Sequence, residues 1–227
     1  MYLQAKGKLN AAKSAAANSF SEYTSHPAKP VPYSDDVHFN RARTYMSDDQ
    51  RFAARRPDVL VFQTDSLTAD VTVTGNIVAD IITSISTTDA DFVVKVIDLF
   101  PDYLGYNEVD IYAETGPVNP YPMGGYQMLV RAEIFRGRFR KSYENPSTFT
   151  PGKIEAIKFE LPSIAHNFKE GHRITVQVQS SRFPLADRNP QMFKDICHCD
   201  TKDFIKRNIK VYKDSKNASK IILPVLK

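Results

Sequence analysis

VTVTGNIVADIITSI, residues 71–85, is the stretch that decides the fold. Its odd-numbered positions are mostly apolar, and its even-numbered positions are mostly polar, as at Thr72, Asn76 and Asp80. Because successive side chains of a strand point to opposite faces of a sheet, the alternation predicts a β-strand with one core face and one solvated face. Gly75 interrupts the apolar row and predicts a bend or a division of the strand.

Similar signals recur on both sides of this stretch. Arg173–Ser180 repeats the alternation, and Phe92–Phe100 is apolar on both parities, which predicts a central strand covered on two faces. In Tyr126–Arg140 the apolar parity switches beside Gly137, which predicts a β-bulge or a bend. Three shorter strand candidates are Val59–Gln63, Lys153–Leu161 and Lys220–Leu226.

The spacing of these segments predicts the fold class. Helical signals are few and short, and no amphipathic helices of about 10–15 residues separate the strands, as a parallel sheet would require. Many strands joined by Pro, Asn and Asp turns favour an all-β sandwich or jelly roll. We predict one domain, with an irregular N-terminal segment over residues 1–56 and the β-sandwich over residues 57–227.

Composition excludes several classes of protein. The 227 residues are 42% apolar, which is enough for a packed core, and two cysteines cannot form a disulfide scaffold. No stretch approaches the roughly 18 apolar residues of a membrane span, so no membrane association is expected. The net charge of +4 comes from 30 basic and 26 acidic side chains that are interspersed along the chain. That excess does not predict nucleic-acid binding.

A search for catalytic motifs finds none. The chain contains no G-x-S-x-G, G-x-G-x-x-G, G-x-x-x-x-G-K or H-E-x-x-H pattern, so we predict no catalytic residue, no cofactor site and no metal site. Cys197–Asp200 reads CHCD, but a closed zinc site needs four ligands and no second cysteine pair exists. We interpret it as a plain loop with reduced thiols.

Three aspartates lie just before or within the most apolar predicted strand. Asp89 and Asp91 precede it, and Asp98 lies within it on the parity of Phe92. A carboxylate that faces a core needs a partner, so we predict structural ion pairs with arginines of a neighbouring strand. Paired carboxylates can instead do general acid–base work, which is the alternative interpretation. The candidate arginines are Arg131, Arg136 and Arg140.

Several stretches resemble a known family. RPDVLVFQT over residues 56–64, TDADFVVK over residues 88–95 and DLFPD over residues 98–102 resemble the C-terminal domain of the Xaa-Pro dipeptidyl-peptidase and cocaine-esterase superfamily. The best match within it is to the α-amino-acid ester hydrolases and glutaryl-cephalosporin acylases. Arg182 stands where that family has tryptophan. Further matches, in the family's order, are Gly125–Arg131, Arg136–Arg140, Phe149–Gly152, Gly171–Ile174, Val176–Ser181, Phe183–Pro184 and Asp187–Gln191.

The resemblance implies a jelly-roll β-sandwich, similar to galactose-binding-like domains, that packs on an α/β-hydrolase domain. That partner domain carries the Ser-Asp-His triad, which in the family's order precedes Tyr2, so the chain is expected to be a non-catalytic part of a longer enzyme. We expect it to help wall an acyl or peptide pocket, with a docking surface that includes Tyr23–Arg56 and the loop Ser84–Asp91. The resemblance favours a periplasmic or extracellular location and leaves a homo-oligomer open.

A free-standing carbohydrate- or protein-binding sandwich is the alternative, because a fold does not by itself determine a function. Its aromatic platform would come from a region rich in tyrosine. The simpler interpretation is that these tyrosines pack in turns or form a lip over the pocket. The tyrosines concerned are Tyr103, Tyr106, Tyr112 and Tyr121.

Overall fold

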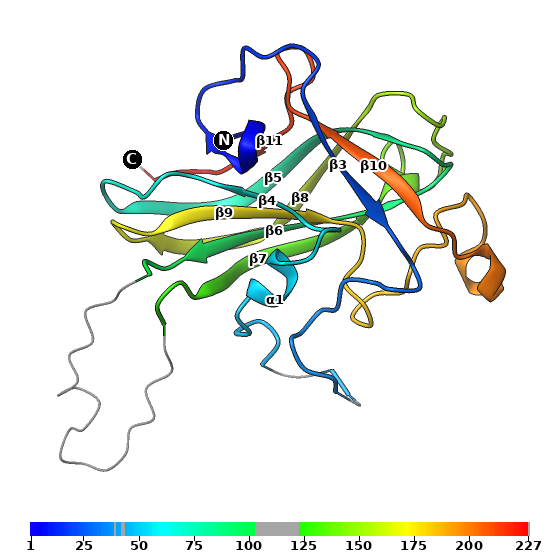
Figure 1. Ribbon diagram of the computed structural model, residues 1–227, viewed down its shortest axis with the longest axis horizontal. Coiled ribbons are helices and arrows are strands. Elements are labelled where there is room, and N and C mark those ends of the chain that lie inside the picture. The colour runs from blue at the N-terminus through cyan, green and yellow to red at the C-terminus, as the bar shows by residue number, and fades with distance from the viewer. Residues whose placement is uncertain (39, 42–43, 103–122, 227) are drawn as a thin grey trace.

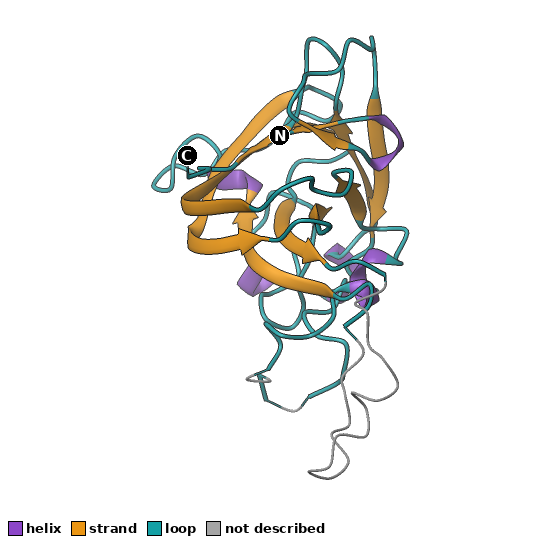
Figure 2. Ribbon diagram, turned by 90° about the vertical axis from the view of Figure 1, so that its left-hand side faces the viewer, coloured by secondary structure: helices purple, strands orange, loops and turns teal. Residues whose placement is uncertain are grey.

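The computed structural model describes residues 1–38, 40, 41, 44–102 and 123–226. Two antiparallel β-sheets pack face to face, with only short helical turns outside them (Figures 1 and 2), which confirms the predicted all-β sandwich. The finer assignment to a jelly roll remains a prediction. No helix in the described part of the chain is long and apolar enough to cross a membrane.

The larger sheet has seven strands in the order β2-β1-β11-β5-β10-β3, and β8 pairs with β5 outside this path. The smaller sheet has four strands in the order β4-β9-β6-β7. The strands of the larger sheet are β1 (Tyr2–Leu3), β2 (Leu9–Asn10), β3 (Phe20–Ser25), β5 (Val71–Ile85), β8 (Glu155–Phe168), β10 (Arg207–Tyr212) and β11 (Lys220–Ile222). Those of the smaller sheet are β4 (Leu60–Gln63), β6 (Asp91–Leu99), β7 (Gln127–Arg136) and β9 (Arg173–Gln179).

Strand β5 is the centre of the larger sheet, as the alternation of its sequence predicts. It pairs with β8 from Val71 to Thr83, and with β10 and β11 on its other edge. The register with β8 shifts between Gly75 and Ile77, and Gly75 has a φ of 117°, which favours glycine. The strand therefore continues through Gly75 with a bulge and does not divide.

The core lies between the two sheets. Most inward residues of β5 and β6 are buried, and Phe135 of β7 stacks on Phe159 of β8 with ring centroids 4.9 Å apart. This burial is the main favourable contribution to folding, at roughly 1.5–3 kcal/mol for each fully buried large apolar side chain. Fully buried members include Val73, Ile77, Ile81, Phe92, Val94, Val96, Leu161, Val176 and Val178.

Gly137 turns the chain out of the smaller sheet. Strand β7 ends at Arg136 and the 3-10 helix η2 (Gly137–Phe139) follows, so the predicted irregularity beside Gly137 is a bend. The Gly137 N–H donates to the Ala90 carbonyl at 2.9 Å, and a Cβ on Gly137 would lie only 2.6 Å from that oxygen. This close approach explains why the turn has no side chain.

The N-terminal segment over residues 1–56, expected to be irregular, contributes β1, β2 and β3 to the larger sheet. Two of these strands have two residues each, too few for a period-two pattern to be recognised in the sequence. The segment then crosses to the smaller sheet, where the short helix α1 (Arg51–Ala54) lies beside β6 and β7 (Figure 1). The Gln50 N–H donates to the Gln127 carbonyl at 3.0 Å and connects the residue before α1 to β7. The boundary at residue 56 remains a prediction.

The other short helical turns are η1 (Ala5–Gly7), η3 (Ile196–His198) and η4 (Thr201–Asp203).

Candidate functional site

The outer face of the smaller sheet, which points away from the core, is unusually polar for a buried surface. On β6 this face carries Val93, Lys95 and Ile97, while β9 places Gln177 directly opposite Lys95. Gln50 and Phe52, at the start of α1, lie over this face at Lys95, and strand β6 is buried on both sides, as its sequence predicts. Four polar side chains are completely buried there, namely Lys95, Thr175, Gln177 and Gln179.

Lys95 is a buried amine without a described carboxylate partner. Its Nζ donates to Gln50 Oε1 at 2.9 Å and lies 5.3 Å from the centre of the Phe52 ring. Burial lowers the pKa of Lys95 well below its usual value, and the positive charge of Arg182 lowers it further. The protein therefore favours the neutral amine at this position.

Arg182 is a second buried basic residue on the same side of the molecule. The residue is 4% exposed, and its guanidinium carbon lies 5.3 Å from the centre of the Tyr45 ring. Its Nε and Nη2 are buried and donate to no acceptor among the described residues. Burial lowers the pKa of Arg182, while Tyr45 and Glu133 act in the opposite direction. Because arginine stays protonated in proteins, the guanidinium carries a positive charge that no carboxylate among the described residues pairs with.

An apolar hollow is lined in part by Phe183, the residue that follows Arg182, and we call it the Val37 hollow. Its walls are mainly apolar, Val37 is fully exposed at 102%, and Phe183 is 37% exposed. The Tyr33 ring lies in its wall, 5.4 Å from the Tyr45 ring that covers Arg182. Exposed apolar groups gathered beside polar ones are typical of interaction surfaces. The lining residues include Pro30, Pro32, Tyr33, Val37, Phe183 and Pro184.

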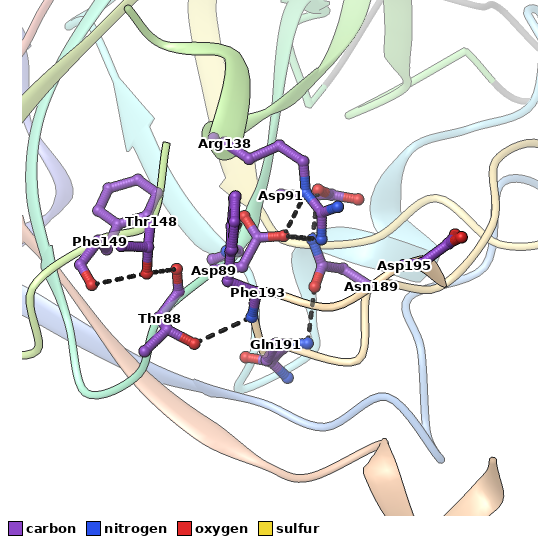
Figure 3. Close-up of polar contacts among 12 residues, drawn as sticks. Thr88, Asp89, Asp91, Arg138, Thr148, Phe149, Asn189, Gln191, Phe193 and Asp195 are labelled. Atoms are coloured by element: carbon purple, nitrogen blue, oxygen red, sulfur yellow. Dashed lines mark hydrogen bonds and ion pairs between the residues drawn. The ribbon is translucent and has the colours of Figure 1, made fainter. Parts of the chain in front are cut away.

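A different arrangement surrounds the carboxylates that precede β6, and we call it the Asp89 cluster. Arg138 donates to Asp89 Oδ2 through Nε at 2.8 Å and through Nη2 at 2.5 Å. The Asn189 amide donates to Asp89 at 3.1 Å and to Asp91 at 2.7 Å, and its oxygen accepts the Gln191 N–H at 2.6 Å. Figure 3 shows Arg138 and Asn189 converging on Asp89. The cluster thereby joins the loop before β6 to residues 189–191.

The two carboxylates of the Asp89 cluster differ in their charge balance. Asp89 is completely buried and forms an ion pair with Arg138. Burial raises the pKa of Asp91 to about 7, and the hydrogen bond from Asn189 opposes that shift. Asp91 is therefore protonated over much of the acidic range.

The candidate arginines have acceptors other than these carboxylates. Arg131 donates to the Ser163 carbonyl at 2.8 Å, and Arg136 lies 3.8 Å from the exposed carboxylate of Asp187, although it faces Asp91 in the strand register. Arg140 forms an ion pair with Glu155 at 2.7 Å. The arginine that meets Asp89 is Arg138, because the bend at Gly137 carries it out of the strand alternation.

Asp98 links the two sheets through histidines. His166 of β8 lies 2.9 Å from Asp98 Oδ2, and His172 lies 2.8 Å from Oδ1. The His172 ring also packs on Phe100 with centroids 4.6 Å apart. Nothing in the local sequence indicates this arrangement, because the contact spans 68 residues in one case and 74 in the other.

Two other sequence features stay outside the site. Cys197 is an exposed free thiol, and His198 is 2.7 Å from Asp195. Over residues 1–38, 40, 41, 44–102 and 123–226, no group of three or more His, Cys, Asp or Glu residues could hold a metal ion. The tyrosine-rich region at 103–121 lies outside the described residues.

Comparison with solved structures gives two strong similarities over the whole chain. An aminopeptidase from a marine sediment Thaumarchaeota archaeon is 38% identical with a TM-score of 0.89, covering 100% of this chain and 36% of its own. An α-amino acid ester hydrolase is 40% identical with a TM-score of 0.87, covering 99% of this chain and 36% of its own.

Sequence comparison agrees with this result. Cocaine esterase of Rhodococcus sp. (strain MB1 Bresler) is 30% identical over 209 residues, which are 92% of this chain and 33% of the esterase. The chain thus spans about a third of the length of these relatives. The model of the X-Pro dipeptidyl-peptidase C-terminal non-catalytic domain matches residues 1–222, and the chain belongs to that family.

Proposed function

We propose that the chain is the docking domain of a serine hydrolase that cleaves esters or N-terminal peptide units, and that it packs on an α/β-hydrolase catalytic domain. Relatives that are an aminopeptidase, an α-amino acid ester hydrolase and a cocaine esterase support this assignment. In each of them the matched region is about a third of the protein, which leaves ample length for a catalytic domain.

The single observation that carries the proposal is the Val37 hollow beside Arg182. It lies in the stretch Tyr23–Arg56 and the neighbouring Phe183–Pro184, and it exposes apolar side chains next to a cation that has no described acceptor. Apolar anchors around a desolvated polar group are the usual composition of the centre of a protein interface. A hydrolase domain seated there would bury the fully exposed Val37.

The Asp89 cluster supports a role in positioning the pocket wall. It holds the loop Ser84–Asp91 through a buried ion pair and a bridging amide, so the backbone of the loop is firmly supported. A rigid loop that contacted the catalytic domain would keep the substrate pocket in one shape. Such support from a neighbouring domain does not require this domain to contribute a reacting group.

The activity test uses the purified 227-residue chain and an aminoacyl ester or dipeptidyl anilide substrate. We expect no turnover by the chain alone, and turnover when the chain is joined to the hydrolase domain encoded with it. Activity of the chain alone that disappears when one of its own residues is mutated would overturn the proposal.

The docking test uses hydrogen exchange of the chain, free and in complex with that hydrolase domain. We expect protection in residues 30–38 and 182–187 on complex formation. Unchanged exchange there would exclude this surface as the docking site. Specific binding of a glycan by the free chain at these same residues would favour the carbohydrate-binding alternative.

A further inference from the structure

We propose that Arg182 is the anchor of the docking surface and receives a carboxylate side chain of the catalytic domain. This inference rests on the proposed function, and it specifies the chemistry of the partner surface. Arg182 is only 4% exposed, yet no described acceptor meets its Nε or Nη2.

The other buried arginines show what is missing at this position. The side chain of Arg138 is 12% exposed and meets Asp89, and that of Arg140 is 1% exposed and meets Glu155. Each of these cations has a carboxylate from a neighbouring part of the chain. Arg182 departs from this pattern, because the titratable groups that act on it are Tyr45, Glu133 and Lys95, and none of them forms an ion pair with it.

The identity of the unpaired atoms indicates the kind of acceptor. Nε and Nη2 form one edge of the planar guanidinium, and this edge matches the two oxygens of a carboxylate. The protein already uses this edge elsewhere: Arg56 offers the same two nitrogens to the two oxygens of Asp58, and Arg138 offers them to Asp89. A carboxylate would therefore satisfy both orphaned donors of Arg182 at the same time.

The surroundings favour a carboxylate that comes from a protein surface. Tyr45 covers the guanidinium and packs on Tyr33, which belongs to the wall of the Val37 hollow. An apolar partner surface that fills the hollow would exclude water from the ion pair and strengthen it. Because Nε and Nη2 are covered in the free chain, docking requires a change of side-chain rotamer at Tyr45 or Arg182, which is common at interfaces.

The test measures association between this chain and the hydrolase domain encoded with it, produced as two polypeptides, by titration calorimetry at low salt. We expect Arg182→Gln to weaken binding by at least about tenfold, because the partner carboxylate would be buried without a cation. Arg182→Lys should retain part of the affinity, since it keeps the charge and loses the two-pronged geometry. The matched control is Arg207→Gln, because the Arg207 side chain donates a hydrogen bond to the adjacent Lys206 carbonyl, forms no ion pair with a described residue, and lies on β10 of the other sheet.

Two further measurements separate docking from a merely structural role. The melting temperature of free Arg182→Gln should equal or exceed that of the wild-type chain, because the change removes an unpaired buried charge. Arg182→Glu should abolish association, and an Asp→Arg or Glu→Arg change in the catalytic domain should restore it. The inference would be overturned if Arg182→Gln bound as tightly as the wild-type chain, or if free Arg182→Gln had a lower melting temperature. It would also be overturned if no Asp→Arg or Glu→Arg change in the catalytic domain restored association with Arg182→Glu. If the wild-type chain does not associate at all, the proposed function itself fails.

Discussion

Two groups of buried ionisable side chains in this protein differ in whether they meet polar or oppositely charged partners within the described part of the chain. In the Asp89 cluster, Arg138 faces Asp89 and an amide bridges to Asp91. On the outer side of the smaller sheet, Lys95 and Arg182 are also buried, but neither contacts a described carboxylate. The buried charge of Asp89 is compensated within this domain, because Arg138 forms an ion pair with it, and an uncompensated buried charge would cost several kcal/mol. The second group is where a partner would contribute most.

Removing the cation of the Asp89 cluster should have the largest effect. Arg138→Met leaves the carboxylate of Asp89 completely buried with only Asn189 as a donor from another side chain. We expect the free energy of unfolding to fall by about 3–5 kcal/mol, measured by urea denaturation at neutral pH. Arg207→Gln, on the other sheet, is the control and should change it little. A loss below about 1 kcal/mol would show that the cluster does not depend on its ion pair.

A smaller effect, opposite in sign, is expected at Asp91. Its pKa is about 7 in the folded protein, against 3.8 for an ordinary aspartate, so between these values the folded state binds more protons than the unfolded state. Stability should therefore fall as pH rises from about 4 to 7. Asp91→Asn removes this dependence and should stabilise the protein by on the order of 1–3 kcal/mol at pH 8. Denaturation curves at pH 5 and pH 8 that keep the same difference in the variant would contradict this assignment.

Lys95 should show the reverse dependence on pH. Its pKa is lowered by burial, so below the usual lysine range the unfolded state binds more protons than the folded state. Stability should therefore rise with pH as it approaches the unfolded pKa of lysine. Lys95→Met should remove that rise between pH 7.5 and 9.5, a range below the one in which tyrosines titrate. At pH 9.5 the free energy of unfolding of the variant should be roughly that of the wild-type chain. A slope that persists in the variant would assign the effect to other groups.

The smallest effect on stability is expected from an exposed ion pair. Lys8 and Asp65 form a salt bridge, but their side chains are 54% and 82% exposed. Water and salt screen such a pair, so Asp65→Asn should leave the melting temperature unchanged within error. A clear loss would mean that exposure, as measured in the free chain, does not separate the important pairs from the unimportant ones.

The sequence predicted the long strands well. The alternation in Val71–Ile85 and the apolar run in Phe92–Phe100 are local patterns, and both segments form the expected strands. Strands β1 and β2 were missed because each is two residues long and exists through pairing with distant segments. Tyr2 pairs with Lys220, so that strand forms only when the two ends of the chain meet.

The candidate site was less predictable from local pattern. The position of Asp89, Asp91 and Asp98 in or beside an apolar strand indicated that these carboxylates need partners, but not which partners. Asn189 lies 100 residues from Asp89, and His172 lies 74 residues from Asp98. The unpaired state of Arg182 is likewise a property of the folded neighbourhood, since nothing in the stretch around it indicates which groups come near.

The strand alternation, the lack of catalytic motifs and the similarity to a family of non-catalytic domains follow from the sequence, because each of these depends on residue order alone. Which buried charges are paired follows from the folded structure. Ion pairing depends on distances of a few ångströms between side chains that are far apart in the chain, and its strength depends on how fully water is excluded. The distances between side chains and the exclusion of water are both set when the two sheets and the N-terminal segment pack together.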